Sequence, residues 1–351
     1  MENLRKNYLR KTIVLFVLAG LNTLAMAQDN ANTNSSLRPS FGLEYTGELQ
    51  TDFEKSRMGN LLQLCAELPL SKSFKLNVST VSFAATKEMP LGGDLQGYSN
   101  IDADNLPLAL AVAGVTWNIS DRHSLFAGVR RIDEDYFCSD ALALFTNSSC
   151  GGFPTISANY DIAAYPMAAV GIHYTYDCKN LTFQTSLYNG TGHNRFAGKE
   201  NVFRVCPKTD GVFAIGQAEY RYHDSRYFVG ASAHYGDLGG TGKKIIRPTA
   251  WVYAEQSVSG SMTLIAAYSR AFSDSSICRN FFGLGGKCSV GKAELGIFTD
   301  YTRMDGIGEW ATELTCSYAL TDIVSVQPVL HIIDTDNHTK CIGMLRLGIS
   351  L

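Results

Sequence analysis

The most chemically active stretch of this chain is a charged cluster in which two arginines are followed closely by three acids. Arg130 and Arg131 precede Asp133, Glu134 and Asp135, with one apolar residue between the two groups. Guanidinium groups donate hydrogen bonds and carboxylates accept them, so such a cluster can bind the hydroxyl groups of a neutral polyol. The same acids could form an exposed turn or bind calcium, but consecutive acids lack the spaced ligands of a calcium loop. We therefore expect no metal site here.

No catalytic motif accompanies this cluster. The sequence contains no Gly-x-Ser-x-Gly, no His-Glu-x-x-His, no phosphate-binding glycine loop and no Cys-x-x-Cys. The 7 histidines are scattered along the chain, so nothing favours a catalytic triad. We predict that the protein is not an enzyme and uses no cofactor.

The cluster begins a long connection, Arg130–Pro166, between two segments of alternating apolar and polar residues. The flanking segments, His123–Arg130 and Met167–Tyr176, are typical of strands with one apolar face. Compact domains rarely contain so long a connection unless it is functional. Its charges and aromatic residues therefore predict a loop that folds back into the lumen of a membrane barrel and narrows it.

Residues 126–190 also carry a family resemblance. The order GVRRIDEDYF, LFTNSSCGGFPTISANY, YPMAAVGIHYTY and SLYNG resembles the central signature of the carbohydrate-selective porins, the OprB-type outer-membrane family. Cys150 departs from that pattern, because an aromatic residue is expected there, and so does the terminal Leu351, where phenylalanine is usual. The resemblance implies an outer-membrane channel that favours neutral sugars. The residues it places at the constriction are Arg130, Arg131, Asp133, Glu134, Asp135 and Asn147.

The chain begins with a secretory signal. Four basic residues precede an apolar core, Ile13–Leu21, and a small-x-small cleavage site, Ala25–Ala27. Loss of these four basic residues and Glu2 takes the formal net charge from −3 to −6. A mildly acidic mature chain argues against nucleic acid as a partner. We divide the chain into a signal peptide (1–27), a flexible lead-in (28–40) and a barrel (41–351).

Alternation of apolar and polar residues continues through the mature chain. Near its end, Leu345, Leu347 and Ile349 oppose Arg346 and Ser350. A period of two over about ten residues is typical of transmembrane β-strands. Short turns are expected at Ser71–Lys72, Ser120–Arg122, Asp177–Asn180, Asp224–Ser225, Ser257–Gly260, Val290–Gly291 and Thr321–Asp322. Longer connections are expected between them, and the count predicts sixteen strands, of which Phe281–Ser289 has the weakest pattern.

By the same alternation, a set of polar and aromatic side chains points into the barrel. Those predicted to line the lumen are Glu67, Glu219, Arg221, Trp251, Tyr253, Glu255, Glu313 and Arg346. Aromatic rings can lie against the apolar face of a pyranose, although any wide barrel needs a polar interior in which opposite charges pair. Sixteen strands enclose a lumen wide enough for an aqueous channel rather than a packed core.

The 9 cysteines are an unusual number for a barrel, and the oxidising periplasm allows pairing. Topology separates most of them: Cys178 lies in a short turn, whereas Cys206 lies in a loop at the opposite end. Cys138 and Cys150 both lie in the constriction loop. We predict that these two form a disulfide that stiffens the loop.

Together these features predict an all-β fold, a transmembrane antiparallel barrel of sixteen strands with a constriction loop after the fifth. The resemblance implies passive diffusion of small neutral sugars across the outer membrane, with membrane lipid around the barrel and a homotrimer as a further expectation. One alternative is a structural or adhesive barrel with a closed bore that binds partners through its outer loops. Another is a secreted β-sandwich enzyme or lectin, which would be soluble without detergent.

Overall fold

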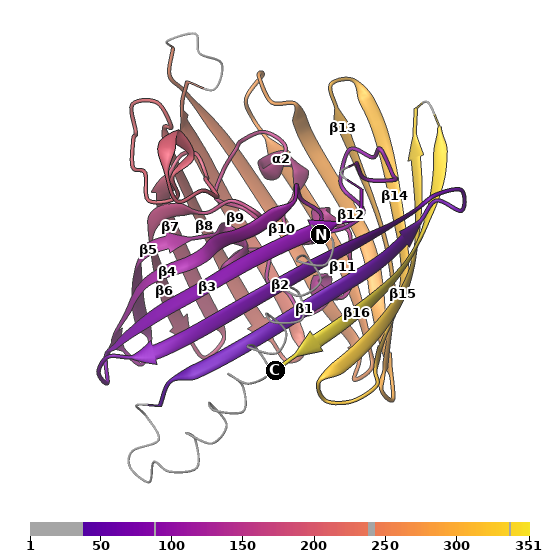
Figure 1. Ribbon diagram of the computed structural model, residues 1–351, viewed down its shortest axis with the longest axis horizontal. Coiled ribbons are helices and arrows are strands. Elements are labelled where there is room, and N and C mark those ends of the chain that lie inside the picture. The colour runs from indigo at the N-terminus through magenta and orange to yellow at the C-terminus, as the bar shows by residue number, and fades with distance from the viewer. Residues whose placement is uncertain (1–37, 88, 238–242, 337) are drawn as a thin grey trace, which may run out of the picture. The chain divides into compact units, whose positions relative to one another are not determined.

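The structure, a computed structural model, describes residues 38–87, 89–237, 243–336 and 338–351 (Figure 1). Chain contacts divide the protein into two units, and the described strands all lie in the second, Pro39–Leu351. The predicted signal peptide and most of the predicted lead-in lie outside the described residues. The first described strand begins at Ser40.

The described residues form sixteen strands that close into one antiparallel barrel (Figure 1). The strands are β1 (Ser40–Thr51), β2 (Ser56–Pro69), β3 (Phe74–Ala85), β4 (Leu106–Ser120), β5 (His123–Arg130), β6 (Ala169–Cys178), β7 (Leu181–Asn189), β8 (Val212–Tyr222), β9 (Ser225–Gly236), β10 (Ile245–Ser259), β11 (Met262–Ala271), β12 (Cys278–Val290), β13 (Ala293–Met304), β14 (Ile307–Ala319), β15 (Val324–Thr335) and β16 (Thr339–Ser350). Each strand pairs with its sequence neighbours, and β1 pairs with β16. Closure removes the unpaired edges that an open sheet would expose. The predicted fold is confirmed.

Short turns and longer connections alternate around the barrel, with a few of the outer connections shorter than expected. The turn from β2 to β3 spans residues 70–73, whereas the connection from β3 to β4 spans 86–105. The weakly patterned segment Phe281–Ser289 lies within β12, which pairs with both β11 and β13. Because this strand exists, the strand count is even. The start of β1 and the end of β16 therefore lie at the same end of the barrel, where Glu44 pairs with Ser350.

Apolar side chains occupy the outer face of the wall and remain exposed there. On β13, Leu295 and Ile297 are 44% and 52% exposed, whereas the inward-facing Phe298 and Asp300 are 1% and 0% exposed. Rows of half-exposed leucine and isoleucine are unfavourable in water and match the hydrocarbon of a bilayer.

The helical segments are short. Within the described residues, no helix combines the length and hydropathy that a membrane-spanning helix requires.

The connection from β5 to β6 folds into the lumen, as predicted. It contains η2 (Ile132–Glu134), η3 (Leu142–Leu144), η4 (Ser148–Cys150) and α2 (Pro154–Ser157), and α2 contacts β11 and β12. Its apolar residues join the inward-facing aromatic residues of the wall in one buried cluster. The expectation of a lumen without a packed core is therefore wrong on this side of the barrel, because the loop supplies a second apolar surface that covers the wall.

Candidate functional site

One side of the constriction loop, residues 131–168, is an aromatic anchor. Phe153 is fully buried, and its ring centre lies 4.9 Å from those of Phe137 and Phe281. Phe137 in turn lies 5.1 Å from Trp251, and Phe153 meets Tyr253 edge to face at 5.8 Å. Aromatic pairs at these spacings stabilise a contact beyond the burial of their area. The loop is thus held against β10 and β12 by its own rings.

This packing changes the role expected of two lumen residues. Trp251 and Tyr253 do point inward, but they are only 2% and 1% exposed because the loop covers them. Neither ring is open to a passing solute. Alternation predicted the face on which these side chains lie, but it carries no information about what covers that face.

A glycine in β13 lets the loop approach the wall. A Cβ at Gly296 would lie 2.8 Å from a methyl carbon of Leu144 and 2.9 Å from the ring of Phe145. Real Cβ atoms do not approach other heavy atoms so closely, so a larger residue would push the loop away. The wall is therefore shaped to receive the segment around η3.

Carboxylates of the wall hold the backbone of the loop. Glu313 accepts hydrogen bonds from the backbone N–H groups of Thr146 and Asn147, both at 2.9 Å. Glu255 accepts one from the N–H of Ala141 at 2.8 Å. The Asn147 side chain donates to Asp300 at 2.8 Å. These acids satisfy loop amides that the burial would otherwise leave unpaired.

Asn147, Glu255 and Glu313 were predicted to meet solute or to line the lumen. All three are buried, with exposures of 2%, 4% and 1%. The structure therefore places them in the attachment of the loop rather than on an open surface.

A second loop enters the lumen, and the sequence did not predict it. The connection from β3 to β4 donates two backbone N–H groups, of Leu95 and Gln96, to Glu309 at 2.7 and 3.2 Å. It also pairs with the constriction loop, since Ser148 N–H donates to Gly97 O at 2.8 Å. Its apolar members, including Leu91 and Tyr98, are buried. Apolar residues in so long an outer connection were the signal that could have found it.

Burial perturbs groups of this second loop. Burial, with the nearby Glu309 carboxylate, raises the pKa of Asp94 to about 6. Burial also raises the pKa of Tyr98, which keeps its hydroxyl protonated and donating to Gln50 at 2.8 Å. The Tyr98 hydroxyl thus attaches the loop to β1, and Asp94 is a titratable acid of the same loop.

The opposite side of the constriction loop is charged. Arg130 donates two hydrogen bonds of 2.6 Å to Asp135, in a bidentate pair. Arg131 pairs with Glu134 and lies 3.4 Å from Asp133. The cluster predicted from the sequence is therefore assembled, and its members mainly bind one another.

Two further arginines complete the charged region. Arg57 of β2, whose side chain is fully buried, donates to Asp102 of the second loop at 2.7 Å. Arg346 of β16 donates to Glu48 of β1 at 2.9 and 2.5 Å. Arg346 was predicted to line the lumen. Arg57 was not, and it lies at the second position of β2, which begins at Ser56.

Two hollows flank the charged region in the described structure. One, of about 250 Å³, lies between the two inserted loops and is lined by Asp102, Asp133 and Tyr165 among others. The other, of about 380 Å³, lies against β1–β4 and is lined by Glu67, Arg130 and Glu134 among others. The Asp133–Glu134 turn reaches both hollows, so it lies between them.

The remaining lumen residues form ion pairs. Glu67 pairs with Lys75 at 2.7 Å, and Glu219 pairs with Arg226 at 2.7 Å. Arg221 pairs with Asp177 at 2.7 Å beside a short turn. These contacts match the simpler interpretation, in which opposite charges inside a wide barrel neutralise each other.

The predicted disulfide is not formed in the structure, where Cys138 and Cys150 are both free thiols. The Cys138 thiol donates to the carbonyl of Asp133 at 3.3 Å, whereas Cys150 is buried in the loop's apolar cluster. The two thiols therefore lie in different surroundings within one loop. Among the described residues, no group of three or more histidine, cysteine or acidic side chains is placed to hold a metal ion.

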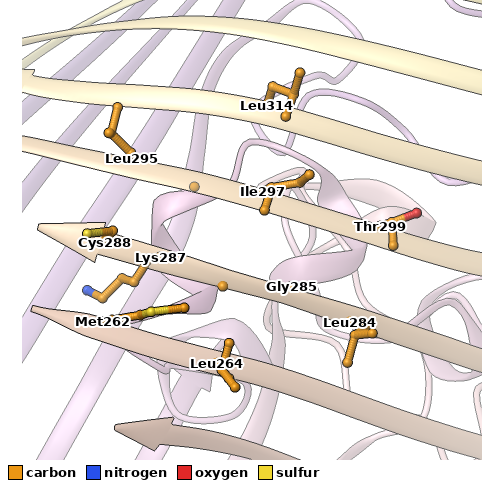
Figure 2. Close-up of a pocket in the computed structure, with 12 residues that line it drawn as sticks. Met262, Leu264, Leu284, Gly285, Lys287, Cys288, Leu295, Ile297, Thr299 and Leu314 are labelled. Carbon is orange, nitrogen blue, oxygen red and sulfur yellow. The ribbon is translucent and has the colours of Figure 1, made fainter. Parts of the chain in front are cut away.

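A larger hollow lies outside the barrel and is not part of this site. It measures about 760 Å³ and is formed by apolar side chains of β11–β14, among them Leu264, Leu284 and Ile297 (Figure 2). These residues are 45%, 63% and 52% exposed on the outward face. Gly286, which also lines the hollow, has no side chain to fill it.

A closed sixteen-strand barrel narrowed by the connection after its fifth strand has the fold of bacterial outer-membrane porins. The chain is similar to OprB of Pseudomonas putida at high pH, with a TM-score of 0.74 and 14% identity over 89% of this chain and 94% of that chain. The low-pH structure of OprB gives a TM-score of 0.58 and 13% identity over 89% and 92%. An anion-selective porin from Comamonas acidovorans gives 0.61 and 12% over 90% and 100%.

By sequence, no protein-family model and no curated protein matches the chain. The structural neighbours are named as outer-membrane proteins and porins rather than enzymes, in line with the expectation of a channel.

Proposed function

We propose that this protein is an outer-membrane porin through which small neutral solutes diffuse, and that monosaccharide-sized sugars are its favoured solutes. One observation carries the proposal: each arginine of the charged region has a carboxylate partner. The pairs are Arg57–Asp102, Arg130–Asp135, Arg131–Glu134 and Arg346–Glu48. Paired charges offer an ion no continuous surface of one sign. The partly exposed members, Arg130, Asp133 and Glu134, still present hydrogen-bond donors and acceptors to hydroxyl groups.

The proposed roles follow from position. Arg130 and Glu134 line the hollow beside β1–β4, and Asp133 lines the hollow between the two inserted loops. A sugar that passes between the hollows therefore meets all three. Their contacts with hydroxyls must be weak and numerous, because flux requires that the solute leaves as readily as it arrives. The resemblance of residues 126–190 to the carbohydrate-selective porins and the likeness to OprB support the same solute class.

Liposome swelling tests the solute preference directly. Vesicles that contain the purified protein are diluted into isotonic monosaccharides, and then into neutral or charged amino acids of similar size. We expect faster swelling in the sugars than in the charged amino acids. Equal rates for all solutes of one size would indicate an unselective pore and would reject the sugar preference.

A closed barrel is the second candidate, and the filling of the lumen favours it. Two loops enter the barrel, and their apolar residues form buried clusters with its wall. A barrel of this kind could serve as a structural or adhesive protein whose outer loops bind a partner. Recording of current across a planar bilayer separates the candidates, because a closed barrel passes none.

We also propose that the barrel assembles as a homotrimer in the membrane. A porin-fold neighbour, OmpT of Vibrio cholerae, is described in a trimer form; it has a TM-score of 0.60 and 11% identity over 90% of this chain and 100% of that chain. Light scattering of the detergent-solubilised protein, corrected for bound detergent, measures the number of chains. A mass of one chain at all protein concentrations would reject the trimer.

A further inference from the structure

Three of the shortest strands of the barrel, β5, β6 and β7, are consecutive. These strands have 8, 10 and 9 residues, whereas β4 and β10 each have 15. Shorter strands leave the upper part of β4 without a partner on one side, since its pairing with β5 ends at Ala113 and Val129. Something other than a strand must cover the outward surface there.

The connection from β7 to β8, residues 190–211, provides this cover. Its Val202 is 1% exposed and packs with Leu110, Val129 and Ala168, in a cluster to which the outward-facing Val170 also belongs. The backbone of His193, in the same connection, forms an isolated β-bridge with Ala168. This loop therefore lies against the outside of the wall, at the level where β5 ends.

Cations gather on this loop and on the neighbouring connection from β9 to β10. We name them the basic rim: Arg195, Lys199, Arg204, Lys208 and Lys244. The two connections touch, because the Lys244 ammonium donates to the carbonyl of Pro207 at 3.1 Å. The same ammonium lies 5.9 Å from the ring centre of Tyr235, an outward residue of β9 that is 46% exposed. The rim is thus continuous with the lipid-facing surface.

The basic rim has an excess of positive charge. Arg195 pairs with Glu200 at 2.8 Å and Arg204 pairs with Asp210 at 3.1 Å. In the described part of the chain, no carboxylate forms an ion pair with Lys199, Lys208 or Lys244. The other outward connections differ: residues 52–55, 272–277, 305–306 and 336–338 carry five acids and a single lysine. Positive charge is therefore concentrated over the short part of the wall.

Large apolar side chains lie beside these cations and are exposed. Phe196, Phe203 and Val205 are 48%, 53% and 60% exposed. Aromatic residues and lysines together are typical of segments that lie in the interface between lipid headgroups and acyl chains. An anionic lipid would neutralise the lysines and cover the apolar residues at the same time, whereas a second copy of this chain would bring a second positively charged rim.

We propose that the basic rim binds the phosphate of anionic lipid headgroups in the outer leaflet, with Phe196, Phe203 and Val205 among the adjoining acyl chains. The inference needs the barrel to lie in a bilayer, but it does not depend on which solute the barrel conducts. Lys199, Lys208 and Lys244 contact the phosphate, and Arg204 holds the loop, donating to Lys199 O at 2.9 Å and to Thr209 at 2.7 Å.

Native mass spectrometry of the full-length protein tests this binding. The detergent-solubilised protein is titrated with phosphatidylglycerol or phosphatidylcholine of identical acyl chains, and the bound lipids are counted. We expect the protein to prefer phosphatidylglycerol by at least roughly fivefold, because each lysine near an anionic headgroup adds to the attraction. In the variant Lys199→Gln/Lys208→Gln/Lys244→Gln, this preference should fall to near one.

The matched control is Lys72→Gln/Lys179→Gln/Lys292→Gln, which removes the same charge from exposed short turns at the opposite end. It should keep the preference of the original protein. Equal loss in both triple variants, or no preference in the original protein, would overturn the proposal. Heat-modifiable migration on gels checks that every variant forms the closed barrel.

Two further experiments separate the alternatives. They distinguish a lipid phosphate from free phosphate, and a lipid from a second copy of this chain as the group that occupies the rim. A large excess of inorganic phosphate should leave the lipid bound; full displacement would make the rim a free-phosphate site and would reject the lipid. Phe203→Ser should weaken binding of phosphatidylglycerol several-fold. If the rim variant changes the number of chains in the particle but not its lipid preference, the rim is a contact between copies and the proposal fails.

Discussion

The two sides of the lumen are built from different chemistry. Toward β10–β14 the constriction loop presents rings such as Phe145 and Phe153, which pack on Phe298 and Phe281. Toward β1, β2 and β16 the lumen presents arginine–carboxylate pairs such as Arg57–Asp102. One side is dry and fixed, and the other is polar and borders the two hollows.

If the barrel conducts as proposed, the difference explains how a single loop can be both rigid and selective. Arg130 and Glu134 lie only a few residues from Tyr136, yet these two charged residues border a hollow whereas Tyr136 is fully buried in the apolar cluster. The apolar face supplies stability by burial, so the charged face does not have to fold the loop. Variants on the dry side should therefore open the barrel, and variants on the polar side should change what passes.

The largest effect is expected on the dry side, from Phe153→Ala. Truncation of a fully buried phenylalanine costs about 3–5 kcal/mol, which should release the loop from Tyr253 and Phe281. We expect single-channel conductance to rise several-fold while the barrel itself persists. Phe153→Leu is the control and should raise conductance much less. An unchanged conductance in Phe153→Ala would mean that the rings do not hold the constriction.

On the polar side, Arg57→Ala should change selectivity more than conductance. The substitution leaves the Asp102 carboxylate without its 2.7 Å partner, so the constriction gains negative charge. The reversal potential under a potassium chloride gradient should shift toward potassium. The double variant Arg57→Ala/Asp102→Ala restores neutrality, so its reversal potential should lie close to that of the original protein. A shift in reversal potential that persists in the double variant would mean that the unpaired Asp102 carboxylate does not cause it.

A smaller effect is expected from pH through the second inserted loop. Because the pKa of Asp94 is raised to about 6, above the usual value near 3.9, the folded loop binds this proton more tightly than the free loop. The stabilisation that protonated Asp94 gives the folded loop is complete below about pH 4 and is lost as the pH rises through about 6. Hydrogen exchange in residues 91–98, corrected for intrinsic rates, should quicken over that range.

The variant Asp94→Asn tests the source of that pH effect. An amide has no proton to lose, so the exchange in residues 91–98 should become independent of pH between 4 and 7. A pH dependence that survives in this variant would assign the effect to another group.

The smallest effect is expected from Arg221→Ala. Its pair with Asp177 is solvent-exposed, with side-chain exposures of 34% and 58%, and such pairs contribute about 0–1 kcal/mol. The single-channel conductance, and the fall in current when sugar is added, should both remain as in the original protein. A changed sugar block would extend the selective region from the constriction to the short-turn end.

Much of the fold could be predicted from the sequence because a closed barrel repeats one local rule. A period of two, turn residues and an even strand count placed the wall, including the weakly patterned β12. The constriction loop could be predicted because its charges and length are unusual for a connection. These are properties of neighbouring residues, which the sequence displays directly.

The inside of the lumen could not be predicted in the same way. Alternation places Trp251 on the inner face, but its burial depends on Phe137, which is more than a hundred positions away. The docking of the second loop depends on Glu309 accepting amides from residues 95 and 96, a contact between distant segments. The separation of Cys138 from Cys150 similarly depends on how each end of the loop meets the wall.

Single-channel recording in a planar bilayer, with a salt gradient and increasing monosaccharide, tests the central claim most directly. If paired charges make the polar side a route for neutral sugars, the open channel should reverse close to zero voltage. Its current should then fall as sugar is added, and Arg130→Ala should weaken this block while raising ion conductance. A silent barrel, or a strongly ion-selective current that sugar leaves unchanged, would contradict the account.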